Sequence, residues 1–101
     1  MTTRKRSSLL PEVPTIAEAG VPGFDYPIWY GVWVPAGTPA GVVDKLAKDI
    51  ARVMAAPDLR DQLAKHGADP MTMTQPEFLR FVLNESESAA RLIKAAGIKP
   101  Q

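Results

Sequence analysis

Apolar residues in the second part of the chain recur three and four residues apart. Three stretches share this spacing: one after Thr38, a short one from Pro57, and a long one after Thr74. Such a period places the apolar side chains along one stripe of a helix, so the pattern predicts three helices. The first stripe consists of Val42, Val43, Leu46, Ile50, Val53 and Met54, and the third of Phe78, Phe81, Val82, Ala89, Leu92, Ile93 and Ala96.

The residues at the ends of these stretches are those that start and stop helices. Thr38, followed by a proline, is expected to cap the first helix, because a threonine hydroxyl accepts from the backbone and proline suits the first turn. Thr74 and Glu77 have the spacing of a capping box. Gly67 and Gly97 are expected to end the second and third helices, since glycine readily adopts the left-handed conformation after a last turn.

The first part of the chain has less regular patterning. Residues 1–13 show no period and predict an irregular arm. Thr15 and Glu18 again have the spacing of a capping box, and Gly20 offers a stop after barely one turn. A short helical turn is therefore expected between the arm and the rest of the chain.

Residues 26–34 alternate in a way that predicts a β-strand with two apolar faces. A strand of this kind is covered on both sides. Residues 68–73 could be its antiparallel partner, although Pro70 would confine that partner to an edge. The predicted fold class is α+β: a short aromatic-rich strand with a possible antiparallel partner, packed against three main helices. The predicted core, above the strand, contains Leu46, Ile50, Phe78, Phe81 and Leu92.

Length and composition bound the possibilities without naming a function. A chain of 101 residues predicts one domain, with residues 1–25 as an arm and short helix and residues 26–101 as strand and helices. A net charge of +1 gives no electrostatic case for nucleic acid, and three basic residues at 4–6 are too few to change that. No apolar run is long enough to span a bilayer, and residues 1–8 lack the apolar stretch of a signal peptide.

Candidate chemistry is nearly absent. His66 is the only histidine and falls in a predicted last helical turn, where a surface residue is the simplest interpretation. The close carboxylate pairs Asp58 with Asp61 and Glu85 with Glu87 lie on helix faces without an acid or base neighbour. There are no cysteines, no cluster of metal ligands and no glycine-rich phosphate loop. We therefore expect no enzyme, no metal and no cofactor.

The aromatic residues are the one ambiguous feature. Phe24, Tyr26, Trp29, Tyr30 and Trp33 could stack on nucleic-acid bases, or they could form a core or the wall of a cleft. Little basic charge lies near them, which favours the core or cleft wall.

Two motifs carry a resemblance to a known family. Residues 11–24 read Pro-x-Val-Pro-Thr-x-Ala-Glu-Ala-Gly-x-Pro-Gly-Phe, and residues 34–39 read Val-Pro-Ala-Gly-Thr-Pro. With Val-Val-Asp-Lys-Leu at residues 42–46 and Gly-Ala-Asp-Pro at residues 67–70, they resemble the C-terminal part of the tripartite tricarboxylate transporter receptors, or Bug proteins. Val34, where the family has alanine, is a mild departure. The resemblance covers essentially the whole chain but only about the last third of a complete receptor.

The resemblance implies a function that the residues alone do not. These receptors are extracytoplasmic proteins that capture small organic carboxylates for membrane transporter subunits, in a cleft between two α/β lobes. The chain would then be a fragment of a two-lobed periplasmic-binding-protein-like fold, with residues 26–34 as a strand crossing between lobes. The main carboxylate-gripping loops would lie upstream. The residues implied as walls of the ligand cleft are Thr2, Thr3, Tyr26, Trp29, Tyr30 and Gly31.

Two further expectations go with this interpretation. The parent protein would be periplasmic, and the fragment would bind carboxylates weakly and could self-associate through an uncovered strand edge. The alternative function is a free-standing protein-interaction module that uses its aromatic strand edge to bind a partner chain.

Overall fold

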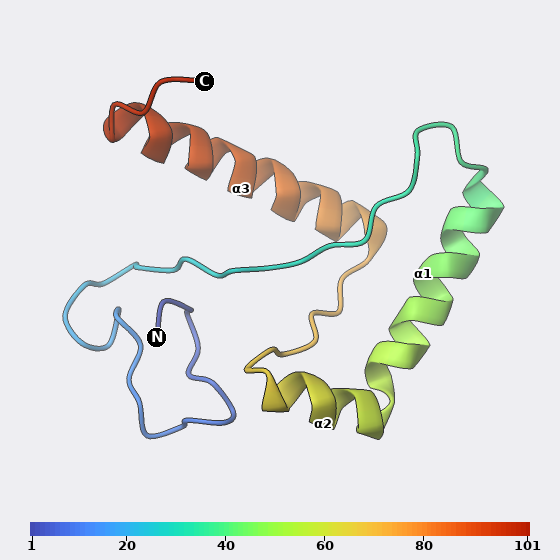
Figure 1. The fold of residues 1–101 in the computed structure, drawn as a ribbon, viewed down its shortest axis with the longest axis horizontal. Helices are drawn as coiled ribbons and strands as arrows, with labels where there is room; N and C mark the ends of the chain where they lie inside the picture. Colours follow the sequence, from blue (N-terminus) through green and yellow to red (C-terminus); the bar gives the residue numbers. More distant parts are fainter. The chain divides into compact units, whose positions relative to one another are not determined.

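The computed structural model describes residues 1–101 and contains three helices and no strand. The helices are α1 (Ala40–Ala55), α2 (Pro57–Lys65) and α3 (Gln75–Ala95), as Figure 1 shows. The chain divides into two compact units, Met1–Pro70 and Met71–Gln101. The first unit holds the N-terminal segment, α1 and α2, and the second holds α3.

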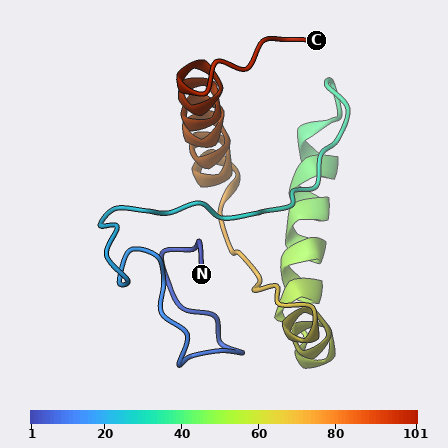
Figure 2. The same ribbon diagram turned by 60° about the vertical axis from the view of Figure 1, so that its left-hand side comes forward.

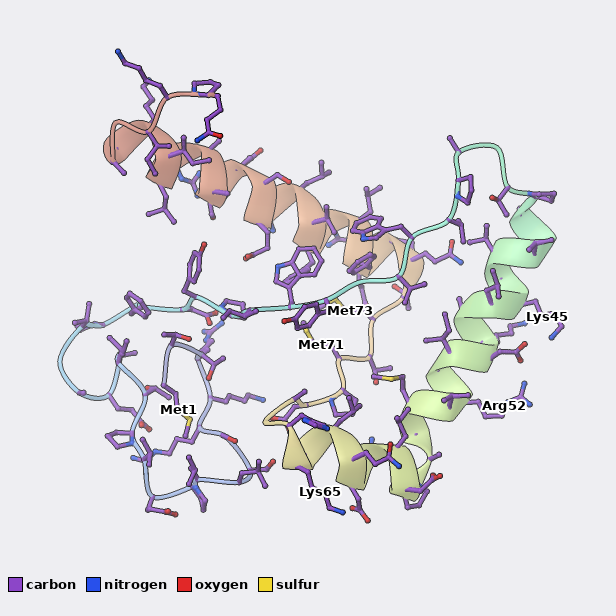
Figure 3. All side chains as sticks on the ribbon, in the orientation of Figure 1. Met1, Lys45, Arg52, Lys65, Met71 and Met73 are labelled. Atoms are coloured by element: carbon purple, nitrogen blue, oxygen red, sulfur yellow. The ribbon has the colours of Figure 1, made fainter.

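Helix α1 starts one step later than its sequence suggests. Pro39 is the N-cap and no side chain caps the helix. The Thr38 hydroxyl donates instead to the Pro35 carbonyl, at 2.7 Å, and so stabilises the preceding turn. On α1, Asp49 pairs with Lys45 at 2.6 Å and with Arg52 at 2.5 Å, and Figure 3 shows both basic side chains on the same side of the helix. The prediction that Thr38 caps α1 is therefore wrong.

Helices α1 and α2 pack against each other across a single connecting residue, Ala56. Its extended backbone ends α1, and Pro57 then starts α2 with the fixed φ that suits a first turn. At the other end, the amide of Ala68 donates to the Leu63 carbonyl at 2.9 Å while Gly67 adopts a φ of 72°. This closing pattern is the one expected where glycine follows a helix. Both predicted ends of α2 are thus confirmed.

Helix α3 has the predicted capping box. The Glu77 amide donates to Thr74 Oγ1 at 3.4 Å, and the Thr74 amide donates to Glu77 Oε2 at 2.8 Å. Gly97, with a φ of 67°, ends the element. Because these signals act between neighbouring residues, they fix the bounds of α3 without help from the rest of the chain.

The predicted α+β class is wrong, because residues 26–34 do not form a strand. They are extended between Pro27 and Pro35 but form no strand, and residues 68–73, the expected partner, form none either. Alternation and β-forming residues favour an extended backbone, yet a strand also needs a hydrogen-bonded neighbour. The chain provides the first condition and not the second.

The predicted core is also absent. No apolar side chain is buried; Leu46 is 41% exposed and Leu92 51% exposed, while Phe78 and Phe81 are half-buried. An amphipathic stripe predicts that one face of a helix packs against another surface, but it does not identify that surface. Here none of the three helices buries a residue of its stripe.

Candidate functional site

The first residues of the chain lie beside the turn that follows Pro14. The amino group of Met1 donates to the Pro14 carbonyl at 3.0 Å, and the Ile16 amide donates back to the Met1 carbonyl at 2.9 Å. The two bonds flank Thr15, in the alternating pattern of parallel backbone pairing. Figures 1 and 2 both show the N-terminal segment curling back so that its end lies against a later part of the same loop.

On its other side, the same segment meets the start of the extended run. The Tyr26 amide donates to the Thr2 carbonyl at 2.8 Å. The Arg4 amide then donates to Asp25 Oδ1, at 3.0 Å, where a backbone carbonyl would be expected in regular pairing. Residues 1–4 are therefore held between two other segments by backbone hydrogen bonds.

Thr15 lies at the centre of this arrangement and is the one buried residue of the chain, at 1% exposure. Its hydroxyl accepts from the Glu18 amide at 3.2 Å, and its own amide donates to Glu18 Oε2 at 2.9 Å. These two bonds form the capping box predicted from the sequence. Gly20, with a φ of 126°, ends the turn. The expected short helical element is present as a single hydrogen-bonded turn rather than as a helix.

Glu18 is also the electrostatic centre of the site. Arg6 Nε donates to the same Glu18 oxygen at 2.8 Å, and Arg6 Nη1 donates to the Pro11 carbonyl at 2.9 Å. The hydrogen bond from the Thr15 backbone, followed by the bond from Arg6, lowers the pKa of the Glu18 carboxyl below its ordinary value. The ionised carboxylate thus joins the arm to the turn.

The structure brings three of the six expected cleft-wall residues together. Thr2 and Tyr26 are joined by their backbone hydrogen bond, and Thr3 lies between Thr2 and Arg4, with its hydroxyl donating to the Lys5 carbonyl at 2.7 Å. Thr2 is exposed and its hydroxyl makes no hydrogen bond. It is therefore free to donate to a ligand.

The other three expected wall residues lie further along the extended run. Trp29 is half-buried, Gly31 is exposed, and Tyr30 is 93% exposed, so that nothing in the chain covers its ring. The backbone groups of Tyr30 and Gly31 make no hydrogen bond. Tyr30 and Gly31 thus offer free backbone N–H donors beside an exposed aromatic ring.

Two contacts of the site carry no obvious sequence signal. Asp25 replaces a backbone acceptor for Arg4, and Ser8 Oγ donates to Asp69 Oδ1 at 3.2 Å. The second bond ties the arm to the loop after α2, across a separation of 61 residues. Asp25 is a short polar residue just before the extended run, and this position could have indicated that it accepts a backbone hydrogen bond. No neighbouring residue indicates that Ser8 bonds to Asp69.

No group of three or more histidine, cysteine, aspartate or glutamate side chains is arranged to hold a metal ion. His66 is the C-cap residue of α2 and is exposed. None of the helices combines the length and the apolar character needed to cross a membrane.

Comparison with known proteins gives the class to which this arrangement belongs. The profile of the tripartite tricarboxylate transporter family receptors matches residues 1–98. A protein from the tcbD–tcbE intergenic region of Pseudomonas sp. (strain P51) is 48% identical over 68 residues, which cover 66% of this chain and 20% of that protein. A protein from the ttuE–ttuC' intergenic region of Agrobacterium vitis is 32% identical over 100 residues, covering 96% of this chain and 29% of that protein.

Solved structures give the same result. The periplasmic binding protein BugD is 35% identical, with a TM-score of 0.82 over 99% of this chain and 34% of that chain. The R. palustris protein Rpa4515, solved with adipate, is 36% identical, with a TM-score of 0.82 over 99% of this chain and 33% of that one. The fold of this chain is that of a part of a periplasmic binding protein. The chain belongs to the tripartite tricarboxylate transporter receptor family.

This result confirms the resemblance that the motifs indicated. The family is one of receptors, so the expectation that the chain is not an enzyme agrees with it. The chain spans about a third or less of the length of the relatives and solved receptors that it matches.

Proposed function

We propose that this chain forms one part of a periplasmic receptor that captures a small organic carboxylate for the membrane subunits of a tripartite transporter. The observation that carries the proposal is the match to Rpa4515, a structure with adipate, over 99% of this chain. The family match over residues 1–98 supports the link to a tripartite transporter. The location follows the periplasmic binding protein BugD.

The N-terminal segment and the extended run at residues 26–34 carry groups that suit one wall of a carboxylate site. A carboxylate accepts hydrogen bonds only, so its site must present donors. Thr2 offers a free hydroxyl, and Tyr30 and Gly31 offer free backbone N–H groups. Thr3, Tyr26 and Trp29 would complete this wall. A concave site also needs convergent groups from an opposite wall, which we assign to the part of the receptor that this chain does not span.

A chimera tests the proposal. The part of Rpa4515 that this chain matches is replaced by this chain, and adipate and other dicarboxylates are titrated by calorimetry. We expect saturable binding that weakens at least fivefold in the Thr2→Val variant, because one donor to the carboxylate is lost, about 1 kcal/mol. Thr72→Val, an exposed threonine in the linker before α3, is the matched control and should bind as the parent does. A folded chimera that binds no carboxylate would refute the proposal.

An interaction module is the second candidate, favoured by the exposure of Ile28 and Tyr30. The same chimera separates the two functions. A module of this kind would bind a partner chain and leave the chimera without carboxylate affinity.

A further inference from the structure

The two most exposed methionines of the chain lie close together, in the segment that leads into α3. Met71 is 51% exposed and Met73 is 38% exposed, and Figure 3 shows both on that segment. Met1 and Met54 are less exposed, and the Met1 sulfur accepts a hydrogen bond from the Ser7 amide at 2.9 Å. The sulfurs of Met71 and Met73 accept none. These two thioethers are therefore the ones that a dissolved reagent reaches most readily.

Met73 also holds a defined position at the start of the helix. Thr74 is the N-cap of α3, so Met73 is the residue just before the cap and Phe78 is the fourth residue of the helix. An apolar pair at these two positions forms a hydrophobic staple, which fixes how the chain enters a helix. A flexible thioether is a favourable partner for an aromatic ring. The sequence thus places a staple beside the capping box.

The start of α3 depends on such local signals. No residue of the helix is buried, so no packed core holds its first turn in place. Within the capping box, the bond from the Glu77 amide to Thr74 Oγ1 is 3.4 Å long, which exceeds the usual length of an N–H···O bond. The Phe78 amide donates to the Thr74 carbonyl at 2.9 Å. A change at Met73 should therefore be felt at the amides of Glu77 and Phe78.

We propose that Met73 is a reversible oxidation site whose sulfoxide loosens the first turn of α3. The reagent is a two-electron oxidant of the peroxide class. The thioether sulfur donates an electron pair to one peroxide oxygen, an S–O bond forms as the O–O bond breaks, and the other oxygen leaves as water. Sulfur is oxidised by two electrons and the peroxide is reduced. The product is polar, which weakens an apolar staple, and sulfoxide reductases restore the thioether.

The test treats this chain with hydrogen peroxide. Mass spectrometry of its peptides locates the added oxygen, and amide exchange by NMR follows the start of α3. Met71 and Met73 should be oxidised before Met54. Exchange at Glu77 and Phe78 should then become about fivefold faster, the change expected when a helix-end signal of ordinary strength is lost. Treatment with methionine sulfoxide reductases for both epimers should return the two amides to their original rates.

Two variants assign the effect to one sulfur. Met73→Leu keeps an apolar side chain but cannot take up oxygen, so its exchange at Phe78 should match the parent's before peroxide and stay unchanged after it. Met71→Leu removes the neighbouring thioether and should respond to peroxide as the parent does. Three results would overturn the proposal. They are oxidation of Met73 no faster than that of Met54, exchange at Phe78 that is unchanged or slower in the sulfoxide form, and equal acceleration in Met73→Leu.

Discussion

At the scale of single residues, two reciprocal pairs of hydrogen bonds join near neighbours in the sequence. Thr15 is the one buried residue; its hydroxyl accepts from the Glu18 amide and its own amide donates to the Glu18 carboxylate, three residues away. Glu18 in turn holds Arg6 at 2.8 Å. The same reciprocal pair occurs at Thr74 and Glu77. Such contacts are readable from the sequence because the two partners are close in it.

Replacing Thr15 with alanine should loosen the turn. The variant loses the acceptor for the Glu18 amide, and removal of a capping hydroxyl costs about 1 kcal/mol. Because the chain has no apolar core, the effect should be local, with exchange of the Glu18 amide about five times faster. Amide exchange by NMR measures this, and Thr72→Ala is the control. Equal protection of Glu18 in both variants would show that the hydroxyl does not hold the turn.

The two capping carboxylates predict how the structure responds to acid. Hydrogen bonds from the Thr15 backbone to Glu18, and from Thr74 to Glu77, lower the pKa of both carboxyls from the ordinary 4.5. A lowered pKa in the folded state means that the stabilisation is complete above the unfolded-state pKa and is lost as the pH falls through the folded-state pKa. Helix content should therefore hold at neutral pH and fall below pH 4.5.

Circular dichroism measures this loss of helix between pH 2 and 7, which is roughly the range in which carboxyl groups titrate. Glu77→Gln should already have lower helix content at neutral pH and show a smaller change on acidification. Glu87→Gln, on the same helix, should behave as the parent does. Identical acid profiles for all three proteins would show that the Glu77 carboxylate does not stabilise α3.

At the scale of elements, the sequence predicts the features that depend on neighbouring residues and fails where distant residues must pair. The bounds of α2 and α3 follow from Pro57, Thr74 and their terminal glycines, because period and capping act within a few residues. The strand at residues 26–34 was predicted wrongly, because pairing depends on a distant segment that alternation cannot reveal. Of the candidate site, the Thr15 turn was predictable, whereas the bond from Ser8 to Asp69 spans too much sequence to be read.

The absence of a core changes what a large-to-small substitution should do. Phe81→Ala would cost about 3–5 kcal/mol in a closed core, but Phe81 is only half-buried on α3. Alanine also favours helix more than phenylalanine does. We therefore expect the helix content of the isolated chain to stay within about a tenth of its original value, measured by circular dichroism. Loss of most of the helical signal would mean that α3 depends on a packed Phe81.

At the scale of the whole molecule, the dominant fact is uncovered surface. The chain exposes 8562 Å², whereas a monomeric protein of this length exposes about 5600 Å² by the usual scaling with mass. The excess agrees with a chain that spans about a third of the solved receptors. The residues of this chain thus leave its apolar side chains without a buried core.

Uncovered apolar surface predicts self-association of the isolated chain. Residues 26–43 present exposed aromatic and branched side chains without a charge to oppose pairing. Sedimentation over a concentration series should show an average mass that rises with concentration. Removing residues 1–13 should enhance the rise, since Thr2 no longer pairs with Tyr26. A constant monomer mass at millimolar concentration for both proteins would show that the segment does not cause self-association.

The most direct test of the account is a titration of the isolated chain with dicarboxylates such as adipate, followed by backbone amide shifts. If the chain supplies only one wall of a carboxylate site, as we propose, the shifts should be small, non-saturating and confined to residues near Thr2 and Gly31. Saturable binding tighter than about 10 µM, roughly 7 kcal/mol, would contradict it, because the chain would then contain a complete site by itself.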